Sequence, residues 1–330
     1  MKIAVASCTK IIDVPDQPVW AEIQAEQPDV LLLLGDNVYL KRDNHTDPAK
    51  LAAGLRKRYA EQFAEPHFKA LIDDLKARDA PVIAIYDDHD FLGNNRCGGE
   101  ADVALCRAAR TEFIAAFQPR QTGKAVYSVT RLGLVDIVAL DGRFYRKAPS
   151  LLQATERDAF LGATQWKWLE KTLAQPTTAK YTLVLSGSTF HSFGGESWEQ
   201  YPTAFTRLRE LLQHRNGAVV VSGDIHKNAI YDETGVLEIV TSAAARLGKT
   251  NRGPRKNYAV LTFDDDRMQV DLRSLQIQWR MNFAVPLSAW AIPRADPVPA
   301  LVKAAQAAVA KAIRKPVVVA VDEAPANSQH

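Results

Sequence analysis

Four apolar runs of the chain each end in side chains that bind metal ions or transfer protons. The runs are residues 3–8, 31–39, 82–90 and 219–226, which read IAVASC, LLLLGDNVY, VIAIYDDHD and VVVSGDIH. A buried strand that ends at Gly-Asp or Asp-His places its polar side chain at one edge of a sheet, and ligands bind along that edge in open α/β sheets. One such ending is explained by turn formation, for which Asp and Gly are common. Because the four endings together supply Cys, Tyr, Asp and His, we interpret them as one polynuclear metal site.

The first two endings favour an oxidised transition metal. Cys8 ends the first run, Asp36 follows Gly35 after the second, and Tyr39 comes shortly after. A carboxylate at position 36 can bridge two cations with its two oxygens. A thiolate, a phenolate and a carboxylate together suit a highly charged transition metal better than Mg²⁺ or Ca²⁺, which prefer oxygen ligands only. Simple packing of the aromatic ring is the alternative role for Tyr39.

The segment from Asp87 to Asp90 is the most specific of the endings. Its acids surround one histidine and would repel one another strongly unless cations were present. We expect Asp88 to bind metal, and His89, oriented by Asp90, to protonate a leaving group. An Asx-turn with an exposed histidine is the alternative interpretation.

Two further groups of polar residues complete the candidate site. Asn94 and Asn95 lie in a loop with Gly93 and can offer amide oxygens to a cation or a substrate. Asp224 and His226 form an Asp-x-His pattern after the fourth run. In an extended chain, residues two apart face the same side, so we expect both side chains to reach one centre.

The composition is that of an ordinary globular protein. The chain has 330 residues, of which 47% are hydrophobic and 24% charged, and its formal net charge is +3. That balance is too even for bulk nucleic-acid binding through a general electrostatic field. No apolar run approaches the roughly 20 residues of a membrane span, and the first residues lack the core of a secretory signal. We therefore expect a cytoplasmic protein, or an exported one if a leader has been trimmed; the oligomeric state stays open.

Cysteine usage argues against a disulfide scaffold. Three cysteines are too few for one. Cys97 and Cys106 are near each other in sequence, so they either form a disulfide in an oxidising compartment or remain reduced and structural; we expect the reduced pair.

Strand-like and helix-like patterns alternate along the chain and must position these residues. Expected strands cover residues 2–7, 29–34, 81–86, 125–131, 134–140, 181–186 and 218–222, and expected helices cover 19–26, 49–64, 66–78, 100–117, 164–174 and 203–214. We expect Thr164 to cap its helix. A meander at 229–232, 236–241, 258–263 and 268–272 follows, with a solvated turn at 264–266. The order predicts two mixed sheets packed together with helices outside, in one catalytic domain of residues 1–293, followed by an Ala-rich helix and polar tail at 294–330.

These motifs together resemble the PhoD-type alkaline phosphatases, within the calcineurin-like metallophosphoesterases. The resemblance rests on ASC (6–8), GDNVY (35–39), DDHD (87–90) with the two asparagines, LDGR (140–143) with the Tyr-Arg pair at 145–146, ESWEQYP (196–202) and SGDIH (222–226). The motifs span residues 4 to about 245, and their order and spacing make the set specific.

The resemblance implies a four-layer α/β sandwich of two mixed β-sheets flanked by helices. It also implies a mixed Fe³⁺ and Ca²⁺ centre, with other divalent metals as the alternative. The family's metal positions match Cys8, Asp36, Tyr39, Asp88, Asp224 and His226. His89 matches the acid of the superfamily. Arg143 lies in the Leu-Asp-x-Arg segment, where it either binds phosphate or forms a salt bridge with Asp141.

The chain departs from the family pattern at two places. In the strand ending LSGSTF (185–190), Ser188 and Thr189 stand where a glutamine is expected, and His191 just beyond is a candidate replacement ligand. The superfamily's opening Asp-x-His motif is absent, and Cys8 fills that role as in the PhoD-type variant.

We expect metal-dependent hydrolysis of phosphoesters by in-line attack of a metal-bound hydroxide. His89 would protonate the leaving alkoxide, and Arg143 would contact the phosphate. Monoesters and diesters both remain open as substrates, and a monoester site needs extra positive charge, for which the loops offer Lys41, Arg42, Arg96 and Arg146. The alternative function is a catalytically weak phosphate- or nucleotide-binding module on the same fold, which loss of metal ligands would indicate.

Overall fold

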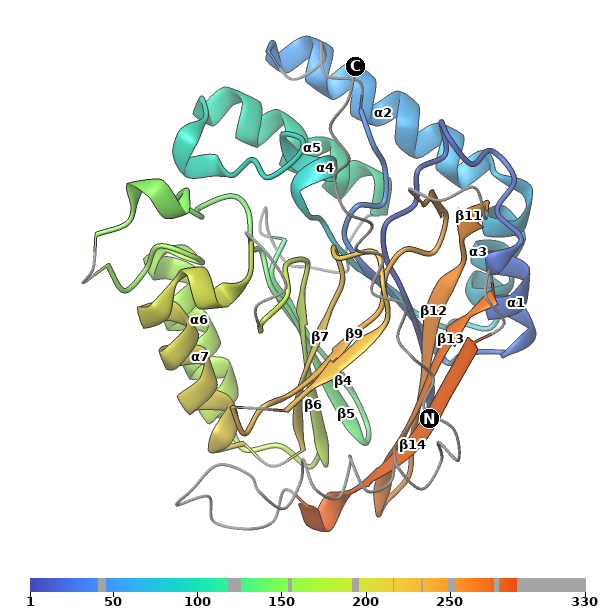
Figure 1. Cartoon of the computed structure of the whole chain (residues 1–330), viewed down its shortest axis with the longest axis vertical. Coiled ribbons are helices and arrows are strands. Elements are labelled where there is room, and N and C mark those ends of the chain that lie inside the picture. Colours follow the sequence, from blue (N-terminus) through green and yellow to red (C-terminus); the bar gives the residue numbers. More distant parts are fainter. Residues whose placement is uncertain are drawn as a thin grey trace, which may run out of the picture.

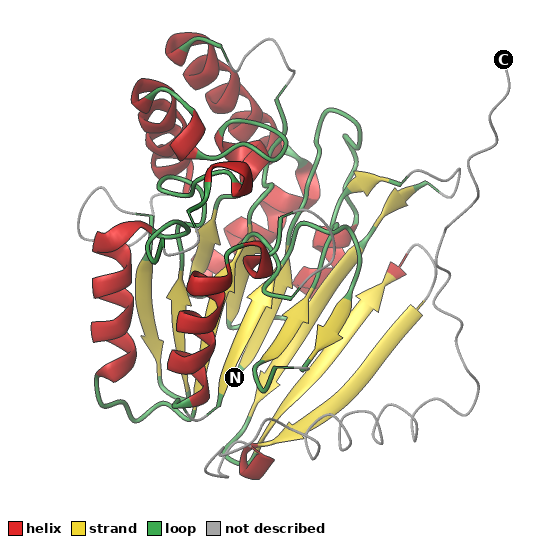
Figure 2. Ribbon diagram, turned by 60° about the vertical axis from the view of Figure 1, so that its left-hand side comes forward, coloured by secondary structure: helices red, strands yellow, loops and turns green. Residues whose placement is uncertain are grey.

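Two mixed β-sheets pack face to face between helices in a computed structural model (Figures 1 and 2). The structure describes residues 1–40, 46–117, 126–153, 156–191, 196–215, 217–232, 234–248, 253–275 and 279–289. Lys41, Arg42 and the predicted tail at 294–330 lie outside these residues.

The first sheet has six strands in the order β14-β13-β12-β1-β2-β3. Their bounds are β1 Lys2–Ala6, β2 Val30–Leu34, β3 Val82–Ile85, β12 Asn257–Phe263, β13 Arg267–Ser274 and β14 Trp279–Pro286. Strands β1, β2 and β3 are parallel, whereas β12, β13 and β14 are antiparallel to their neighbours. The carboxyl ends of the three parallel strands therefore lie at one edge of this sheet.

The second sheet also has six strands, in the order β4-β5-β6-β7-β9-β8. Their bounds are β4 Ser128–Leu132, β5 Val135–Ala139, β6 Tyr181–Ser186, β7 Ala218–Ser222, β8 Ala229–Tyr231 and β9 Leu237–Val240. The four central strands are parallel, and β4 and β8 are antiparallel edges. A separate two-stranded ribbon joins β10 Arg246–Leu247 to β11 Pro254–Arg255.

Helices cover the outer face of each sheet, as the hydrophobic cores show. Figure 1 places α6 and α7 on one side of the sheets and α1 and α3 on the other. The described residues form the helices α1 Val19–Ala25, α2 Pro48–Ala64, α3 Pro66–Ala77, α4 Asp88–Phe91, α5 Val103–Phe117, α6 Gly162–Ala174 and α7 Pro202–Gln213. One core joins the first sheet to α1, α2, α3 and α5, a second lies between the sheets, and a third joins the second sheet to α6 and α7. This confirms the predicted four-layer sandwich.

The structure corrects the predicted elements at two places. Helix α6 begins at Gly162, and Thr164 lies inside its first turn instead of capping it; the N-cap position, Leu161, makes no side-chain hydrogen bond. Gly162 has φ of +76°, and a Cβ there would lie 2.8 Å from the Tyr145 side chain, so backbone geometry and packing at the glycine decide where the helix starts. Strand β14 was not predicted, because its sequence, WRMNFAVP, lacks a clean alternation.

Several smaller predictions are confirmed. Gly133 forms the β4–β5 turn with a φ of +61°. The Asp264 carboxylate accepts hydrogen bonds from the backbone N–H groups of Asp266 and Arg267, so that acidic run is a hairpin turn. Cys97 and Cys106 are both buried, and no disulfide joins them. Among the described helices, none is both long and apolar enough to span a membrane.

Candidate metal centre and arginine cluster

Strand ends from both sheets meet at the candidate site. Cys8 follows β1, Asp36 follows β2, Asp88 begins α4 directly after β3, and Asp224 follows β7. The Cys8 N–H donates to the Gly35 carbonyl at 3.2 Å, which ties the ends of β1 and β2 together. A Cβ on Gly35 would lie 2.5 Å from the Asp87 Cβ, so only glycine permits this approach of the second and third endings.

Left-handed backbone conformations shape the site. Cys8, Asp36, Asp224 and His226 have φ values of 57°, 54°, 66° and 57°. Such values are uncommon for residues other than glycine, and they cluster at functional sites because surrounding contacts must impose them. The chain at 224–226 is therefore not extended, which corrects our expectation. His226 nevertheless reaches Cys8 and Asp36, because the backbone turns sharply there.

Asp36 lies at the centre of the proposed ligands. Its Oδ2 is 3.4 Å from the Cys8 Sγ and accepts a hydrogen bond from the Tyr39 hydroxyl at 2.6 Å. Ligand atoms of Cys8, Asp36 and His226 lie within 4.8 Å of one another, and so do those of Asp36, Asp88 and His89. Asp36 belongs to both groups, so its carboxylate would be available to a cation held by either of them, and His89 belongs to the second group.

Crowding and burial make negative charge unfavourable here without cations. Burial, followed by the charges of Asp88 and Asp87, raises the pKa of Asp36 well above its ordinary value. Burial and the same two charges raise the pKa of Asp224 to about 8. Burial and the charge of Asp36 likewise raise the pKa of the Cys8 thiol. Bound cations would reverse these shifts, because they stabilise the deprotonated forms.

Some buried polar atoms in this region have no hydrogen-bond partner among the described residues. They include Oδ2 of Asp87, Oδ1 of Asp88 and Nη1 of Arg143. Unpaired buried charges are costly, so each is expected to meet a ligand or ion. The donor set fits a transition metal on the Cys8, Tyr39 and His226 side, and a hard divalent cation beside the carboxylates.

Asp90 does not orient His89, contrary to our prediction. Its buried carboxylate accepts hydrogen bonds from the backbone N–H groups of Asn37 and Val38, both at 3.0 Å, and from Asp87 at 3.2 Å. The Tyr59 hydroxyl also donates to it. Asp90 thus fixes the loop that carries Asp36 and Tyr39 against α4, and its role is positional. The His89 ring instead packs on Tyr39, with ring centroids 4.1 Å apart.

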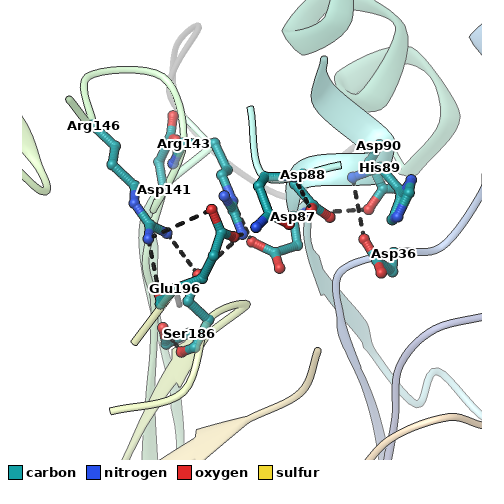
Figure 3. A network of polar contacts seen from close by, with 12 residues as sticks. Asp36, Asp87, Asp88, His89, Asp90, Asp141, Arg143, Arg146, Ser186 and Glu196 are labelled. Carbon is teal, nitrogen blue, oxygen red and sulfur yellow. Dashed lines mark hydrogen bonds and ion pairs between the residues drawn. The ribbon is translucent and has the colours of Figure 1, made fainter. Parts of the chain in front are cut away.

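We define the arginine cluster as Arg143, Arg146, Ser188 and Glu196. Figure 3 shows Arg143, Arg146 and Glu196 beside Asp87 and Asp88. Arg143 is fully buried and pairs with Asp87 at 2.6 Å and with Glu196 at 2.8 Å. Ser188 accepts hydrogen bonds from both arginines, at 3.1 and 2.7 Å. Together with Asp87, Glu196 gives the two arginines two carboxylates, and Nη1 of Arg143 has no hydrogen-bond partner among the described residues.

The two alternatives for Arg143 are now distinguished. The Asp141 carboxylate accepts hydrogen bonds from the backbone N–H of Arg143 at 3.1 Å and from the Tyr86 hydroxyl at 2.6 Å. It makes no ion pair with the Arg143 guanidinium. Arg146 is held by the Tyr201 hydroxyl at 2.8 Å and by the Glu196 carbonyl at 2.8 Å. Arg146 is thus a structural residue and not the loop cation that we expected.

His191 does not replace the missing glutamine. Its Nδ1 lies 2.8 Å from the Glu238 carboxylate and its Nε2 lies 2.8 Å from the Thr234 hydroxyl, so both ring nitrogens are engaged. Glu238 also accepts the hydroxyl of Ser222 at 2.6 Å. The residue at the expected position, Ser188, binds arginines. The end of β6 therefore contributes to the arginine cluster and not to the metal ligands.

Asn94, Asn95 and Arg96 are exposed. The Asn95 backbone N–H donates to Asp88 at 2.6 Å, and the Asn94 amide donates to the Asn95 side chain at 2.7 Å. These asparagines therefore flank Asp88 from the solvent side, where a substrate would approach.

Arg246 and Ser242 were missed by the sequence reasoning. The Ser242 hydroxyl donates to the Cys8 sulfur at 3.1 Å. Arg246 donates to the Tyr39 hydroxyl at 3.1 Å and to Nε2 of His226. Neither residue belongs to a strand ending of the predicted kind, and the sequence around them, TSAAARL, carries no metal-binding pattern.

Comparisons with known proteins identify the family and support the fold. A family model described as PhoD-like phosphatase matches residues 3–263. A solved structure of PhoD is 19% identical over 86% of this chain and 68% of that chain, with a TM-score of 0.63, which supports the fold. An uncharacterized protein from Streptococcus pneumoniae TIGR4, described as a predicted phosphoesterase, is 12% identical over 86% of this chain and 97% of that chain, with a TM-score of 0.33. Zinc-bound Vps29 from Entamoeba histolytica is 9% identical over 87% of this chain and 99% of that chain, with a TM-score of 0.36. A search of curated proteins found no match.

Proposed function

We propose a reaction for this chain from one premise: it belongs to the PhoD-like phosphatase family and is therefore a phosphoric ester hydrolase. The proposed reaction is metal-dependent hydrolysis of a phosphoester by water. One observation carries the proposal: the Asp36 carboxylate lies close to two groups of possible ligands. Cys8, Tyr39 and His226 form the first group, and Asp88 belongs to the second. Turn formation alone does not require a thiol, a phenol and an imidazole at these positions.

We assign two kinds of cation to the site. Cys8, Tyr39 and His226 would hold a ferric ion, because thiolate, phenolate and imidazole suit an oxidised transition metal. Asp88 and Asp224 would hold calcium, and Asp36 would be shared. When bound, the metal ions supply an activated water and positive charge that stabilises the phosphoryl oxygens.

His89 is the proposed general acid. Its imidazole packs on the Tyr39 ring and makes no hydrogen bond to another residue that the structure describes. Its backbone N–H donates to Asp36 at 3.2 Å, which anchors the residue beside the shared carboxylate. Burial lowers the pKa of His89 to about 4, so its action as a general acid requires that a bound phosphoester stabilise the protonated ring.

Arg143 is the proposed phosphate ligand within the cluster. Asp87, Ser188 and Glu196 hold its Nε and Nη2, and these contacts aim the remaining nitrogen. Nη1 is buried without a partner among the described residues. A preorganised guanidinium of this kind forms a strong charge-assisted hydrogen bond to a phosphoryl oxygen.

Metal analysis with a substrate panel tests the proposal. Protein purified without chelator is expected to contain iron and calcium and to hydrolyse aryl phosphoesters, and chelation should abolish this activity. If iron binds Cys8 and Tyr39, the protein will absorb visible light by charge transfer, and Tyr39→Phe will shift or remove the band. A fully metal-loaded protein that hydrolyses no ester would instead support the phosphate-binding module.

A further inference from the structure

Arg246 is fixed beside the centre by the backbone that precedes it. The Ala244 N–H donates to the Ser7 carbonyl at 2.7 Å, and the Lys10 N–H donates to the Ala245 carbonyl at 2.7 Å. These bonds attach the segment before β10 to the end of β1, on both sides of Cys8. The backbone that carries Arg246 is therefore held by hydrogen bonds to the same segment that carries Cys8.

The Arg246 guanidinium contacts two of the proposed metal ligands. It lies 4.9 Å from the centroid of the Tyr39 ring, and its Nη1 donates to Nε2 of His226. A neutral imidazole nitrogen has only one lone pair. Nε2 of His226 therefore cannot accept this hydrogen bond and bind a metal ion at the same time. A metal bound to Nε2 of His226 would therefore release this Arg246 N–H group for another acceptor.

Arg246 also differs in charge from the buried arginines. Arg143 pairs with Asp87 and Glu196, whereas Arg246 makes no ion pair with a carboxylate in the part of the chain that the structure describes. The acidic groups that act on Arg246 are Tyr39, Cys8 and Asp36, all of which are proposed metal ligands. Once cations neutralise those groups, the positive charge of Arg246 remains available to a substrate.

We propose that Arg246 binds a terminal oxygen of the phosphoryl group and makes the site selective for phosphate monoesters over diesters. The inference rests on the proposed phosphoester hydrolysis. A monoester is mostly dianionic at neutral pH and has three non-bridging oxygens, whereas a diester has one negative charge and two such oxygens. Two oxygens can face the cations and Arg143, and the third, which only a monoester has, meets the Arg246 fork.

Substitution of Arg246 tests the proposal with a pair of matched substrates. The ratio of kcat/KM for 4-nitrophenyl phosphate to that for bis(4-nitrophenyl) phosphate is measured in wild-type protein and in Arg246→Gln. Loss of a charge-assisted contact should lower the monoester value by about 10- to 100-fold, while the diester value changes by less than about threefold. Arg246→Lys should recover only part of the loss, because lysine lacks the planar fork.

Arg255→Gln is the matched charge control. Arg255 is the register partner of Arg246 in the β10–β11 ribbon, but its guanidinium donates to the backbone carbonyl of His226. This variant removes the same charge from the same ribbon, so the substrate ratio should stay within about threefold of wild type. Bound metal is measured in every variant, and equal metal content is expected. An equal loss for both substrates in Arg246→Gln, or the same change in Arg255→Gln, would overturn the proposal.

Calorimetric titration separates this inference from the proposed reaction. Metal-loaded protein is titrated with inorganic phosphate and with dimethyl phosphate. Arg246→Gln should weaken the binding of phosphate by about 10-fold or more and leave that of dimethyl phosphate unchanged. If neither ester is hydrolysed but this selective loss occurs, the proposed reaction fails and the role of Arg246 stands. An unchanged phosphate affinity contradicts the role of Arg246 whether or not esters are hydrolysed.

Discussion

The two halves of the site balance charge in opposite ways. In the arginine cluster, Glu196 and Asp87 pair with Arg143, and Ser188 joins Arg143 to Arg146. In the metal half, Asp36 and Asp224 are buried next to other carboxylates, and burial together with their charges raises the pKa of both groups. In the first half the charged groups pair with one another, although Nη1 of Arg143 has no partner among the described residues, whereas the second half gathers carboxylates that bound cations would neutralise.

This difference locates where ligands must bind. A buried ion pair with hydrogen bonds to its remaining atoms is stable without further partners, but unpaired buried charge is not. Asp87 joins the halves: one of its oxygens pairs with Arg143 and the other has no partner among the described residues. We therefore expect substitutions in the metal half to reduce activity and metal binding, and substitutions in the cluster to reduce stability first.

Asp36→Asn should have the largest effect. The substitution keeps the shape of the side chain but removes the charge that makes sharing two cations favourable. We expect loss of bound metal and a fall in kcat beyond about 10⁴-fold, the upper range for one general acid. Metal analysis and steady-state kinetics measure this, with circular dichroism to show an unchanged fold. If Asp36 only caps the turn after Gly35, the variant will keep its metal and its activity.

His89→Ala should have the next largest effect, and it should depend on the leaving group. An alkoxide needs a proton in the transition state, whereas an activated aryl oxide does not. We expect a loss of about 10²- to 10⁴-fold with alkyl phosphoesters and a much smaller loss with 4-nitrophenyl esters. Equal losses on both substrates, together with reduced metal content, would show that His89 is a metal ligand instead.

Arg143→Gln should lower stability, and it should also weaken phosphate binding, because it removes the proposed phosphate ligand. The change leaves Asp87 and Glu196 without their cation in a buried position, which costs about 3–5 kcal/mol in the free energy of unfolding. Urea unfolding measures the loss. Glu196→Gln in the same chain should recover part of it, because the pair is then removed together. Additive losses in the double variant would contradict the compensated cluster.

His191→Gln should have the smallest effect on chemistry. It breaks the contact with Glu238, which is fully buried, and should cost about 1.5–3 kcal/mol of unfolding free energy, typical of a hydrogen bond to a charged group. Metal content and kcat should match those of wild type. A loss of metal in this variant would mean that His191 reaches the centre after all.

Much of the fold could be predicted from the sequence because local patterns determine it. Parallel strands that are buried on both faces have continuous apolar sequences. Strands β1, β2 and β7 coincide with such apolar runs. Helices α2 and α3 begin at prolines and follow Asp47 and Glu65, whose side chains accept capping hydrogen bonds. The start of α6 was not predictable in this way, because the Tyr145 ring packs against Gly162 from a distant part of the chain.

The residue types that end the strands are legible in the sequence, and they predict that Cys8, Asp36 and Asp224 gather at the carboxyl ends of parallel strands. Which of the neighbouring polar residues contact these side chains depends on tertiary packing. Asp90 turns to the backbone of residues 37–38 and His191 turns to Glu238, while Arg246 enters from a ribbon more than 200 positions after Tyr39. The physical reason is that a hydrogen-bonding side chain binds the partner that packing brings within about 3 Å, and such partners are remote in sequence.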